Sequence, residues 1–323
     1  LVIEDLMISK PGPHEVLIRT AACGLCHSDL HFIEGAYPHP LPAVPGHEAA
    51  GIVEAVGSEV RTVKPGDAVV TCLSAFCGHC EYCVTGRMSL CLGGETRRSP
   101  KDAPRLSRAD GSVVNQMLNL SAFAEQMLIH EHACVKIDPD MPLDRAAVIG
   151  CAVTTGAGAI FNACKLTPGE TVTVVGCGGV GLAAIMIAKS RGATVIGIDT
   201  SNPARDRARL AGADYVLDSI HDDVVKEIKK YSSNPILNEI LNQTVVKIPS
   251  ERSMVGLDSV FKSQAFAGMQ MNESIETSQP VAPVTEEQGK VMNVLNRDFR
   301  SLMKAVDKKK QTGSIGSGMV SME

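Results

Sequence analysis

Two stretches near the start of the chain carry side chains that could hold a metal ion and move a proton. The run Cys26-His27-Ser28-Asp29-Leu30-His31 places a thiol, two imidazoles and a hydroxyl within six residues. A deprotonated Cys is a good zinc ligand, and Ser and His can pass a proton along hydrogen bonds. Gly46-His47-Glu48 adds an imidazole and a carboxylate, although a purely structural His is an equal alternative there.

Four cysteines form the most specific motif in the sequence. Cys77-x-x-Cys80-x-x-Cys83 is followed by Cys91, on a Gly-rich polar stretch with little apolar material. Four thiolates fill a tetrahedral zinc site and leave no position for a substrate, so we expect a structural site. Metal binding would then supply much of the folding energy of this lobe. Disulfides are the weaker alternative, because cysteines spaced so closely are hard to pair locally.

Cys151 is a further candidate ligand. It lies in a stretch of small and apolar residues, 143–158, that predicts a buried helix. A Cys in such a place is usually a core residue. It becomes a candidate only because an open zinc site needs a third protein ligand.

A glycine-rich turn predicts a dinucleotide-binding site. Gly176-x-Gly178-Gly179-x-Gly181 follows a strand expected at 171–175, and it precedes a helix expected at 182–191 and a strand at 193–198. The glycines would let the backbone approach a pyrophosphate at the helix N-terminus.

The residue at the end of the second strand bears on the choice of cofactor. Asp199 would accept hydrogen bonds from the ribose hydroxyls and repel a 2′-phosphate. That favours NAD over NADP, although Arg205 nearby could tolerate a phosphate.

The elements that must position these side chains are of two kinds. The first part of the chain has short apolar alternations broken by Pro and Gly, which predict a small β-barrel or sandwich. Strands are expected at 15–19, 51–56, 68–71, 121–127 and 133–137. From residue 171 strands and helices alternate, which predicts a parallel sheet. A third unit follows, with a helix at 203–211, a strand at 215–217 and a helix at 222–230.

Two segments fit neither kind. Residues 93–120 are polar and predict a solvated loop, with a lid over a substrate pocket as the alternative. After residue 232 the chain is rich in Asn, Ser, Gln and Glu, and apolar residues return at helical spacing only at 286–310. That pattern predicts an amphipathic helix, whose terminal Lys308-Lys309-Lys310 suits a helix C-terminus. Residues 313–323 are expected to be disordered.

Composition excludes several function classes. A chain of 323 residues suits about two or three domains, and its 44% hydrophobic and 21% charged residues are ordinary for a globular protein. Few aromatics, no Trp and a net charge of −5 argue against a nucleic-acid partner. No apolar run approaches the roughly 20 residues of a membrane span, and the first residues do not read as a signal peptide. Eleven cysteines, an odd number, favour thiolate ligands and a cytoplasmic protein over a secreted disulfide framework.

Together these motifs resemble the zinc-containing alcohol dehydrogenases of the medium-chain dehydrogenase/reductase superfamily, over residues 1 to about 231. The resemblance rests on Cys26-His27-Ser28, Gly46-His47-Glu48-x-x-Gly51, the four-cysteine lobe, Cys151 and Gly176-Cys177-Gly178-Gly179-Val180-Gly181. It implies an α/β protein: a GroES-like β-barrel catalytic domain at 1–155, with the zinc lobe at 77–91, and an incomplete Rossmann-type NAD-binding domain at 156–231. The tail at 232–323 is not recognised.

The resemblance also implies two zinc ions and NAD, held at matching positions. The catalytic zinc would be bound by Cys26, His47 and Cys151, with Glu48 behind them or as a transient ligand, and the structural zinc by Cys77, Cys80, Cys83 and Cys91. The Ser28 hydroxyl would take the proton of the zinc-bound alcohol and relay it through the cofactor ribose to His31, as the alkoxide gives its hydride to the nicotinamide. Cofactor contacts are implied for His27, Thr155, Gly176, Gly178, Gly179, Val180, Gly181, Asp199 and Arg205.

The expected function is therefore oxidation of a primary alcohol to an aldehyde by an NAD-dependent zinc enzyme. A thiol-adduct formaldehyde dehydrogenase is one alternative, because the longer family members also have a polar stretch after Cys91. A catalytically silent zinc-stabilised protein that acts through the helix at 286–310 is the other, because the family has more cofactor-domain strands and a C-terminal return to its catalytic domain, neither visible here. The expected partner is a small alcohol or aldehyde, and a homo-oligomer is possible.

Overall fold

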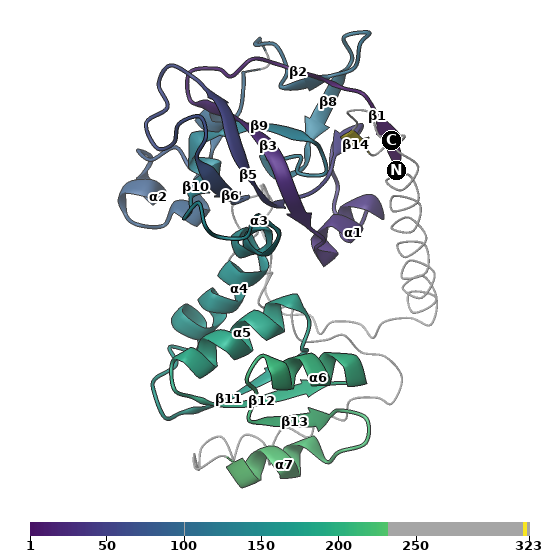
Figure 1. The fold of residues 1–323 in the computed structure, drawn as a ribbon, viewed down its shortest axis with the longest axis vertical. Helices are drawn as coiled ribbons and strands as arrows, with labels where there is room; N and C mark the ends of the chain where they lie inside the picture. Colours follow the sequence, from purple (N-terminus) through teal and green to yellow (C-terminus); the bar gives the residue numbers. More distant parts are fainter. Residues whose placement is uncertain (100, 232–318, 322–323) are drawn as a thin grey trace, which may run out of the picture.

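The computed structural model describes residues 1–99, 101–231 and, for the backbone only, 319–321. Figure 1 shows a β-rich unit at one end and a smaller three-layer unit at the other, joined by helices α3 and α4. The candidate metal ligands come from the β-rich unit and from this junction. The glycine-rich turn lies in the smaller unit.

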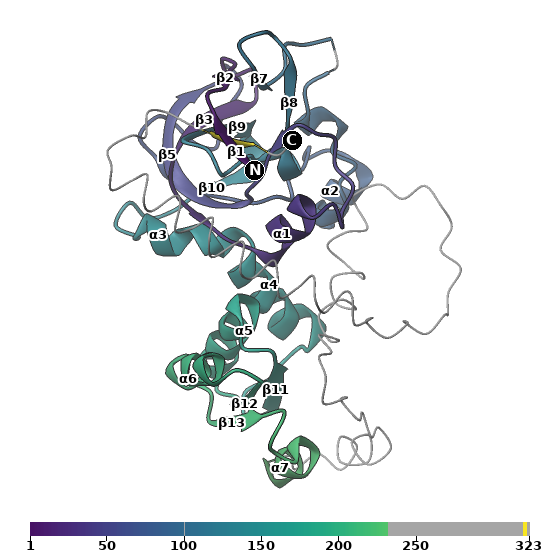
Figure 2. The same ribbon diagram turned by 90° about the vertical axis from the view of Figure 1, so that its right-hand side faces the viewer.

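The main sheet of the β-rich unit has the order β10-β6-β5-β3-β9, and every neighbouring pair is antiparallel. Its strands are β3 (Glu15–Gly24), β5 (Glu48–Val56), β6 (Ala68–Thr71), β9 (Gln126–His130) and β10 (Cys134–Lys136). Buried β-branched and long apolar side chains such as Val16, Ile18 and Met127 fill its interior. In Figure 2, β5 curves around this core, so the sheet closes toward a barrel.

Four of the five strands expected here are confirmed, and the one expected at 121–127 is wrong. The strand begins only at Gln126. Ser121 has a positive φ of 64°, and the N–H groups of Ala122 and Phe123 donate to the carbonyls of Gly46 and Pro45. Those bonds hold the segment beside His47 instead of placing it in the sheet.

Residues 93–120 form a partly buried layer, so the solvated loop expected there is wrong for much of its length. β7 (Leu106–Ser107) and β8 (Val113–Gln116) join β2 (Met7–Ile8) and β4 (Ala43–Val44) in a second sheet of order β2-β7-β8-β4. Leu106 and Val114 are buried in their own apolar cluster. Short helical turns complete the unit at Glu81–Val84 (α2), Met88–Leu90, Gly94–Thr96, Met117–Asn119 and Glu131–Ala133.

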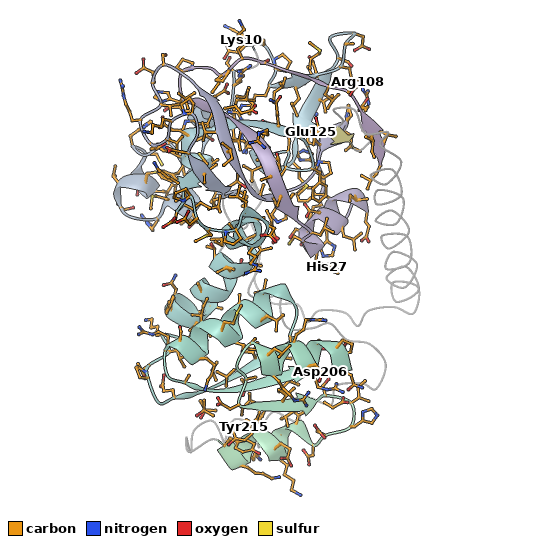
Figure 3. All side chains as sticks on the ribbon, viewed as in Figure 1. Lys10, His27, Arg108, Glu125, Asp206 and Tyr215 are labelled. Atoms are coloured by element: carbon orange, nitrogen blue, oxygen red, sulfur yellow. The ribbon has the colours of Figure 1, made fainter. Side chains whose placement is uncertain are left out.

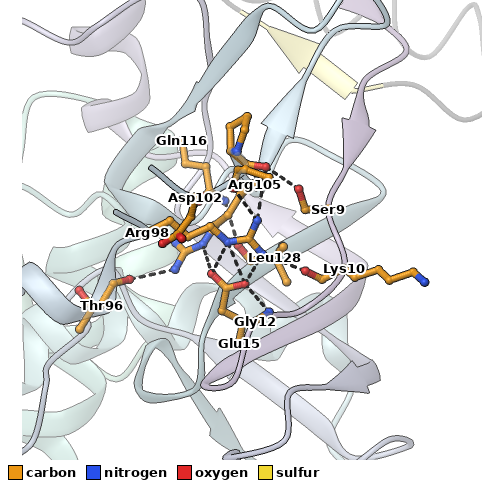
Figure 4. A network of polar contacts seen from close by, with 12 residues as sticks. Ser9, Lys10, Gly12, Glu15, Thr96, Arg98, Asp102, Arg105, Gln116 and Leu128 are labelled. Atoms are coloured by element: carbon orange, nitrogen blue, oxygen red, sulfur yellow. Dashed lines mark hydrogen bonds and ion pairs between the residues drawn. The ribbon is translucent and has the colours of Figure 1, made fainter. Parts of the chain in front are cut away.

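A buried ion-pair network explains how so polar a segment is held (Figure 4). The Glu15 carboxylate accepts from Nε of Arg105 at 2.7 Å and from Nη2 of Arg98 at 2.5 Å. Arg105 also donates to Gln116 Oε1 and to the Thr96 carbonyl. Burial raises the pKa of Glu15, but the hydrogen bonds from Arg98, Gly12 and Arg105 outweigh it, so the net pKa is lowered and the group stays ionised.

The smaller unit is a parallel sheet of order β11-β12-β13, as expected from the sequence. Its strands are β11 (Thr171–Val175), β12 (Thr194–Asp199) and β13 (Tyr215–Asp218), and its helices are α5 (Gly179–Ser190), α6 (Asn202–Leu210) and α7 (Val224–Tyr231). Val195 packs with α5 and α6, whereas Ile196 and Ile198 pack with Ile228 of α7. The two faces of the sheet are therefore covered by different helices.

The helix expected at 143–158 is broken. α3 (Leu143–Ala146) and a 3-10 turn (Ala147–Gly150) precede Cys151, and α4 (Ala152–Gly158) and a π turn (Ala159–Ala163) follow it. Cys151 itself has φ −129° and ψ −77°, outside the helical region. Among the residues described, no single helix is long and apolar enough to cross a membrane; only the bent pair Leu143–Gly150 and Ala152–Ala163 meets that test when its halves are taken together.

The end of the chain returns to the β-rich unit, which corrects two expectations. β14 (Met319–Ser321) pairs antiparallel with β1 (Val2–Glu4) and lies against β4. Residues 319–321 are thus ordered, and a return to the first unit does exist. The helix expected at 286–310 and its lysine run lie outside the described residues.

We predict that Glu15→Gln lowers the free energy of unfolding by about 3 kcal/mol, because it leaves the buried Arg105 guanidinium without a counter-charge. Glu54→Gln is the matched control, since Glu54 pairs with Arg19 at a solvent-exposed site and its loss should cost less than about 1 kcal/mol. Urea denaturation followed by circular dichroism measures both. Equal losses in the two variants would contradict the role given to the network.

Candidate active site

The four cysteines of the lobe converge as the sequence predicts. The Sγ atoms of Cys77 and Cys83 lie 3.9 Å apart, those of Cys80 and Cys83 3.5 Å, those of Cys80 and Cys91 3.8 Å, and those of Cys77 and Cys91 3.6 Å. Thiolates bound at ~2.3 Å in a tetrahedron lie about 3.8 Å apart, so the set fits zinc. The backbone N–H groups of Cys77 and Gly93 donate to Cys91 Sγ, and these bonds hold that sulfur beside the other three.

A second cluster joins three separate parts of the fold. Cys26 caps the N-terminus of α1 (His27–Ile33), His47 and Glu48 lie at the start of β5, and Cys151 lies at the break before α4. One ligand atom from each of these four residues lies within 4.8 Å of the others, and the two Sγ atoms are 3.9 Å apart. The structure thus brings together every residue expected at the open metal site.

Asp29 positions two of these ligands, and sequence analysis missed it. Its Oδ1 is 2.9 Å from His47 Nδ1, and its Oδ2 accepts from the Cys26 backbone N–H at 3.0 Å. The carboxylate is almost fully buried, and it fixes Nδ1 as the protonated nitrogen of His47. Its signal was the acid three residues after Cys26, which is the pattern of a helix N-terminal cap.

The other nitrogen of His47 shows that this cluster fits a metal ion. His47 is 1% exposed, and its Nε2 is buried without a hydrogen-bond partner among the described residues. Burial lowers the pKa of His47, but the Asp29 carboxylate and Cys26 raise it more, to about 10. An unpartnered buried nitrogen in so negative a surrounding is costly unless a cation occupies it. Zinc, with two sulfurs and one nitrogen as ligands, suits this donor set.

The two thiols of the cluster are electrostatically unequal. The hydrogen bond from Cys151, together with His47, lowers the pKa of Cys26 to about 3, whereas Cys26 and burial raise the pKa of Cys151. Cys26 is therefore the more acidic of the two thiols. A divalent cation bound here would displace the proton of Cys151, because metal ligands must be deprotonated.

Glu48 lies behind the ligands, pressed against the backbone. A Cβ at Gly24 would lie 2.3 Å from Glu48 Oε2, so only glycine leaves room for this carboxylate. Burial and the neighbouring Cys26 thiolate raise the pKa of Glu48. The carboxylate is close enough to belong to the cluster, and its role as a transient ligand stays a prediction.

The expected proton-relay residues share helix α1. Ser28 and His31 are three residues apart, which places them one above the other on one side of a helix. The His31 ring packs edge-on against His27 and Tyr37, with centroid separations of 5.0 and 5.2 Å. Figure 3 places His27 at the end of the β-rich unit that faces the smaller unit, and its side chain is exposed. These are the positions a relay needs, although the relay itself stays a prediction.

The glycine-rich turn has the shape expected of a pyrophosphate cradle. Gly176 has φ 89°, and a Cβ at Gly181 would lie 1.9 Å from the Gly176 carbonyl oxygen. Gly178, at the N-cap of α5, has no described atom within 4 Å of where its Cβ would be. That open space beside the N-terminus of a 12-residue helix suits an anionic group.

Helix α4 connects the metal cluster to this turn. Cys151 caps α4, and a Cβ at Gly156 would lie 2.9 Å from the Val180 carbonyl oxygen and 2.8 Å from the Ala184 nitrogen of α5. Thr155 lies one turn after Cys151, and its N–H donates to the Cys151 carbonyl at 2.8 Å. Thr155 and Val180, both expected to contact the cofactor, therefore lie on two helices that pack against each other, α4 at the junction and α5 in the smaller unit.

The remaining two expected cofactor residues differ in their surroundings. Asp199 ends β12, and its Oδ2 accepts from the Cys177 backbone N–H of the turn at 2.8 Å. Arg205, by contrast, is 7% exposed, and its guanidinium is bound by Asp199, Asn202 and Asp218. The structure does not present the Arg205 charge as a free phosphate partner.

Comparison with known families agrees with both halves of this description. Residues 12–139 match the family described as alcohol dehydrogenase GroES-like domain. Residues 179–248 match the family described as zinc-binding dehydrogenase. The first match covers most of the β-rich unit, and the second begins at the first residue of α5 in the smaller unit.

Individual relatives give the same picture. An S-(hydroxymethyl)glutathione dehydrogenase of Saccharomyces cerevisiae is 37% identical over 270 residues, which is 81% of this chain and 65% of that protein. Among solved structures, a benzyl alcohol dehydrogenase from Acinetobacter calcoaceticus is 38% identical, with a TM-score of 0.62 over 70% of this chain and 62% of that one. An alcohol dehydrogenase zinc-binding domain protein from Burkholderia ambifaria is 36% identical, with a TM-score of 0.65 over 70% and 63%. The chain thus spans less than two thirds of the length of each.

We predict that Asp29→Asn weakens zinc binding at the open cluster about 10- to 100-fold. Both carboxylate oxygens of Asp29 accept hydrogen bonds, one from His47 and one from the Cys26 backbone, and the amide NH2 of Asn would replace one of these acceptors with a donor. After dialysis against a chelator, elemental analysis should find one zinc per variant chain and two per wild-type chain. Asp67→Asn, which removes a carboxylate paired with Lys136 away from the cluster, is the matched control and should keep both. Two zinc ions retained by both variants would contradict the role of Asp29.

Proposed function

This chain belongs to the zinc-containing alcohol dehydrogenases of the medium-chain dehydrogenase/reductase superfamily, and we propose that it oxidises a primary alcohol to an aldehyde with NAD as hydride acceptor. The observation that carries the proposal is the buried, unpartnered Nε2 of His47 between two thiols. That atom needs a cation. Helix α4 then joins the cation site to a glycine-rich turn suited to a dinucleotide.

The residues of the cluster divide the work of alcohol activation. Cys26, His47 and Cys151 would hold zinc, which when bound supplies a Lewis acid that lowers the pKa of an alcohol hydroxyl. Asp29 fixes the His47 tautomer so that Nε2 is the free ligand nitrogen. With only these three protein ligands, a bound zinc would have room for the substrate as a further ligand.

We assign proton removal to Ser28 and His31. Ser28 is two residues from Cys26, so its Oγ is the nearest hydroxyl in sequence to the metal cluster. Its Oγ would accept the alcohol proton and pass it toward His31, on the same side of α1. The half-buried His31 ring gives the proton a route to water.

We infer NAD, not NADP, as the cofactor from the surroundings of Asp199. Its carboxylate lies at the end of β12 beside the glycine-rich turn, where it would accept hydrogen bonds from a ribose and repel a 2′-phosphate. The nearby Arg205, which could have reversed this preference, is paired with Asp218 at 2.8 Å. His27, Thr155 and the turn itself would contact the rest of the dinucleotide.

The thiol adduct of formaldehyde is a second candidate substrate. It is supported by the yeast relative, which is named for S-(hydroxymethyl)glutathione, and by the ordered layer at 93–120, where Arg97 is exposed. The benzyl alcohol dehydrogenase relative instead supports an aromatic primary alcohol. All eleven cysteines are free, so we infer a reducing compartment such as the cytoplasm.

The test is NADH formation by the purified zinc-loaded chain with ethanol, long-chain alcohols, benzyl alcohol and S-(hydroxymethyl)glutathione in turn. We expect turnover with at least one of them, lost on chelation and lowered at least about 1,000-fold in Cys26→Ala, because the ligand set is then incomplete. Cys164→Ala is the matched control, since Cys164 is exposed and outside both clusters, and it should keep wild-type turnover.

Two results would contradict the proposal. One is turnover that survives both chelation and Cys26→Ala. The other is folded protein with two bound zinc ions that reduces NAD with none of these alcohols. The second result would favour the catalytically silent alternative.

A further inference from the structure

Arg205 lies at the meeting point of three chain segments on the carboxyl side of the parallel sheet. Its Nη1 donates to the Asp199 carbonyl at 2.7 Å, and its Nη2 contacts Asn202 Oδ1 and lies 2.8 Å from Asp218 Oδ2. The guanidinium thus ties the end of β12 to the first turn of α6 and to the end of β13. The Arg205 side chain is 9% exposed, so these contacts are shielded from water.

The carbonyl that Arg205 holds belongs to the residue expected to bind ribose. The Asp199 carboxylate accepts from the Cys177 N–H at 2.8 Å and from the Ser201 N–H at 2.8 Å. Each carboxylate oxygen can accept a second hydrogen bond, so both remain able to bind hydroxyls. Arg205 therefore fixes the backbone of Asp199, while Cys177 and Ser201 fix its side chain.

Asp218 neutralises Arg205 from the other side. The Asp218 carboxylate also accepts from the Ile220 N–H at 2.9 Å and lies 3.0 Å from His221 Nδ1. His221, the Ile220 N–H and the Arg205 charge all lower the pKa of Asp218, so it is ionised at neutral pH. Without that negative charge, an unneutralised guanidinium would lie against the Asp199 backbone, beside the residue expected to bind the ribose.

We propose that Arg205 is a positioning residue for the adenosine ribose of NAD, and that Asp218 keeps the Arg205 charge from attracting a 2′-phosphate. The inference rests on the proposed function, since it assumes that a dinucleotide binds at the glycine-rich turn. The choice between NAD and NADP would then depend on the ion pair between the buried Arg205 and the partly buried Asp218, neither of which need contact the cofactor. This also reverses the sequence-based expectation that Arg205 could accommodate a phosphate.

The first test measures nucleotide binding in the absence of turnover. Isothermal titration of the zinc-loaded full chain uses 5′-AMP and adenosine 2′,5′-bisphosphate, which carry the adenosine half of NAD and of NADP. Wild type should prefer 5′-AMP. In Asp218→Asn the ratio of the affinity for 5′-AMP to that for the bisphosphate should fall at least about tenfold, because the Arg205 guanidinium is no longer neutralised and attracts the 2′-phosphate.

Variants of Arg205 separate position from charge. Arg205→Met should weaken the binding of 5′-AMP about tenfold without strengthening the binding of adenosine 2′,5′-bisphosphate. In turnover assays it should raise the KM for NAD more than it lowers kcat. Arg205→Lys, which keeps the charge but not the planar fork, should recover only part of the 5′-AMP affinity. Arg209→Met is the control, because Arg209 forms an exposed pair with Asp206 on the same helix, and it should behave as wild type.

The outcomes are distinct. Wild-type nucleotide preference in folded Asp218→Asn overturns the proposal, and so does unchanged 5′-AMP affinity in folded Arg205→Met. If thermal melting shows that Arg205→Met does not fold, the proposal is tested by Asp218→Asn alone, through the ratio of its affinities for 5′-AMP and adenosine 2′,5′-bisphosphate. Wild-type protein that binds neither nucleotide overturns the proposed function as well, whereas normal wild-type binding with unchanged variants overturns this inference only.

Discussion

Close backbone packing on both sides of Cys151 is the constraint on which the site depends. A Cβ at Gly150 would lie 1.7 Å from the Thr71 carbonyl oxygen of β6, and one at Gly156 would lie 2.8 Å from the Ala184 nitrogen of α5. The chain before Cys151 is therefore pressed against the β-rich unit, and the chain after it against α5. Packed interiors have little free space and low compressibility. The Cys151 thiol is therefore held in a fixed position relative to both units.

The same constraint explains why the metal cluster and the glycine-rich turn can act together. The proposed hydride transfer requires two reactants in near contact, which in this fold would be an alcohol at the cluster and a nicotinamide at the smaller unit. The helix pair α4 and α5 supplies that alignment without a long loop. Two carboxylates fix the neighbouring side chains: the buried Asp29 orients His47, and the partly buried Asp218 neutralises Arg205.

Sequence reasoning found the chemistry where motifs are local and missed what depends on distant pairing. Cys26, the four lobe cysteines and the glycine-rich turn are legible because their ligand spacing and turn shape are set within a few residues. Asp29 went unnoticed because its partner His47 is eighteen residues away. Arg105 was expected in a solvated loop because its counter-ion Glu15 is ninety residues away. The break at Cys151 and the pairing of β14 with β1 also follow from tertiary contacts that no local pattern announces.

The most direct test of the account is the visible spectrum of the cobalt-substituted chain during titration with NADH. Cobalt in a site with two thiolates and one imidazole has bands that respond to its surroundings, and the four-thiolate site serves as an internal reference. If α4 and α5 hold the metal cluster beside the nicotinamide, NADH binding will shift the bands of the open site and leave those of the lobe unchanged. NADH that binds, as shown by its own fluorescence, without moving the open-site bands would contradict the account.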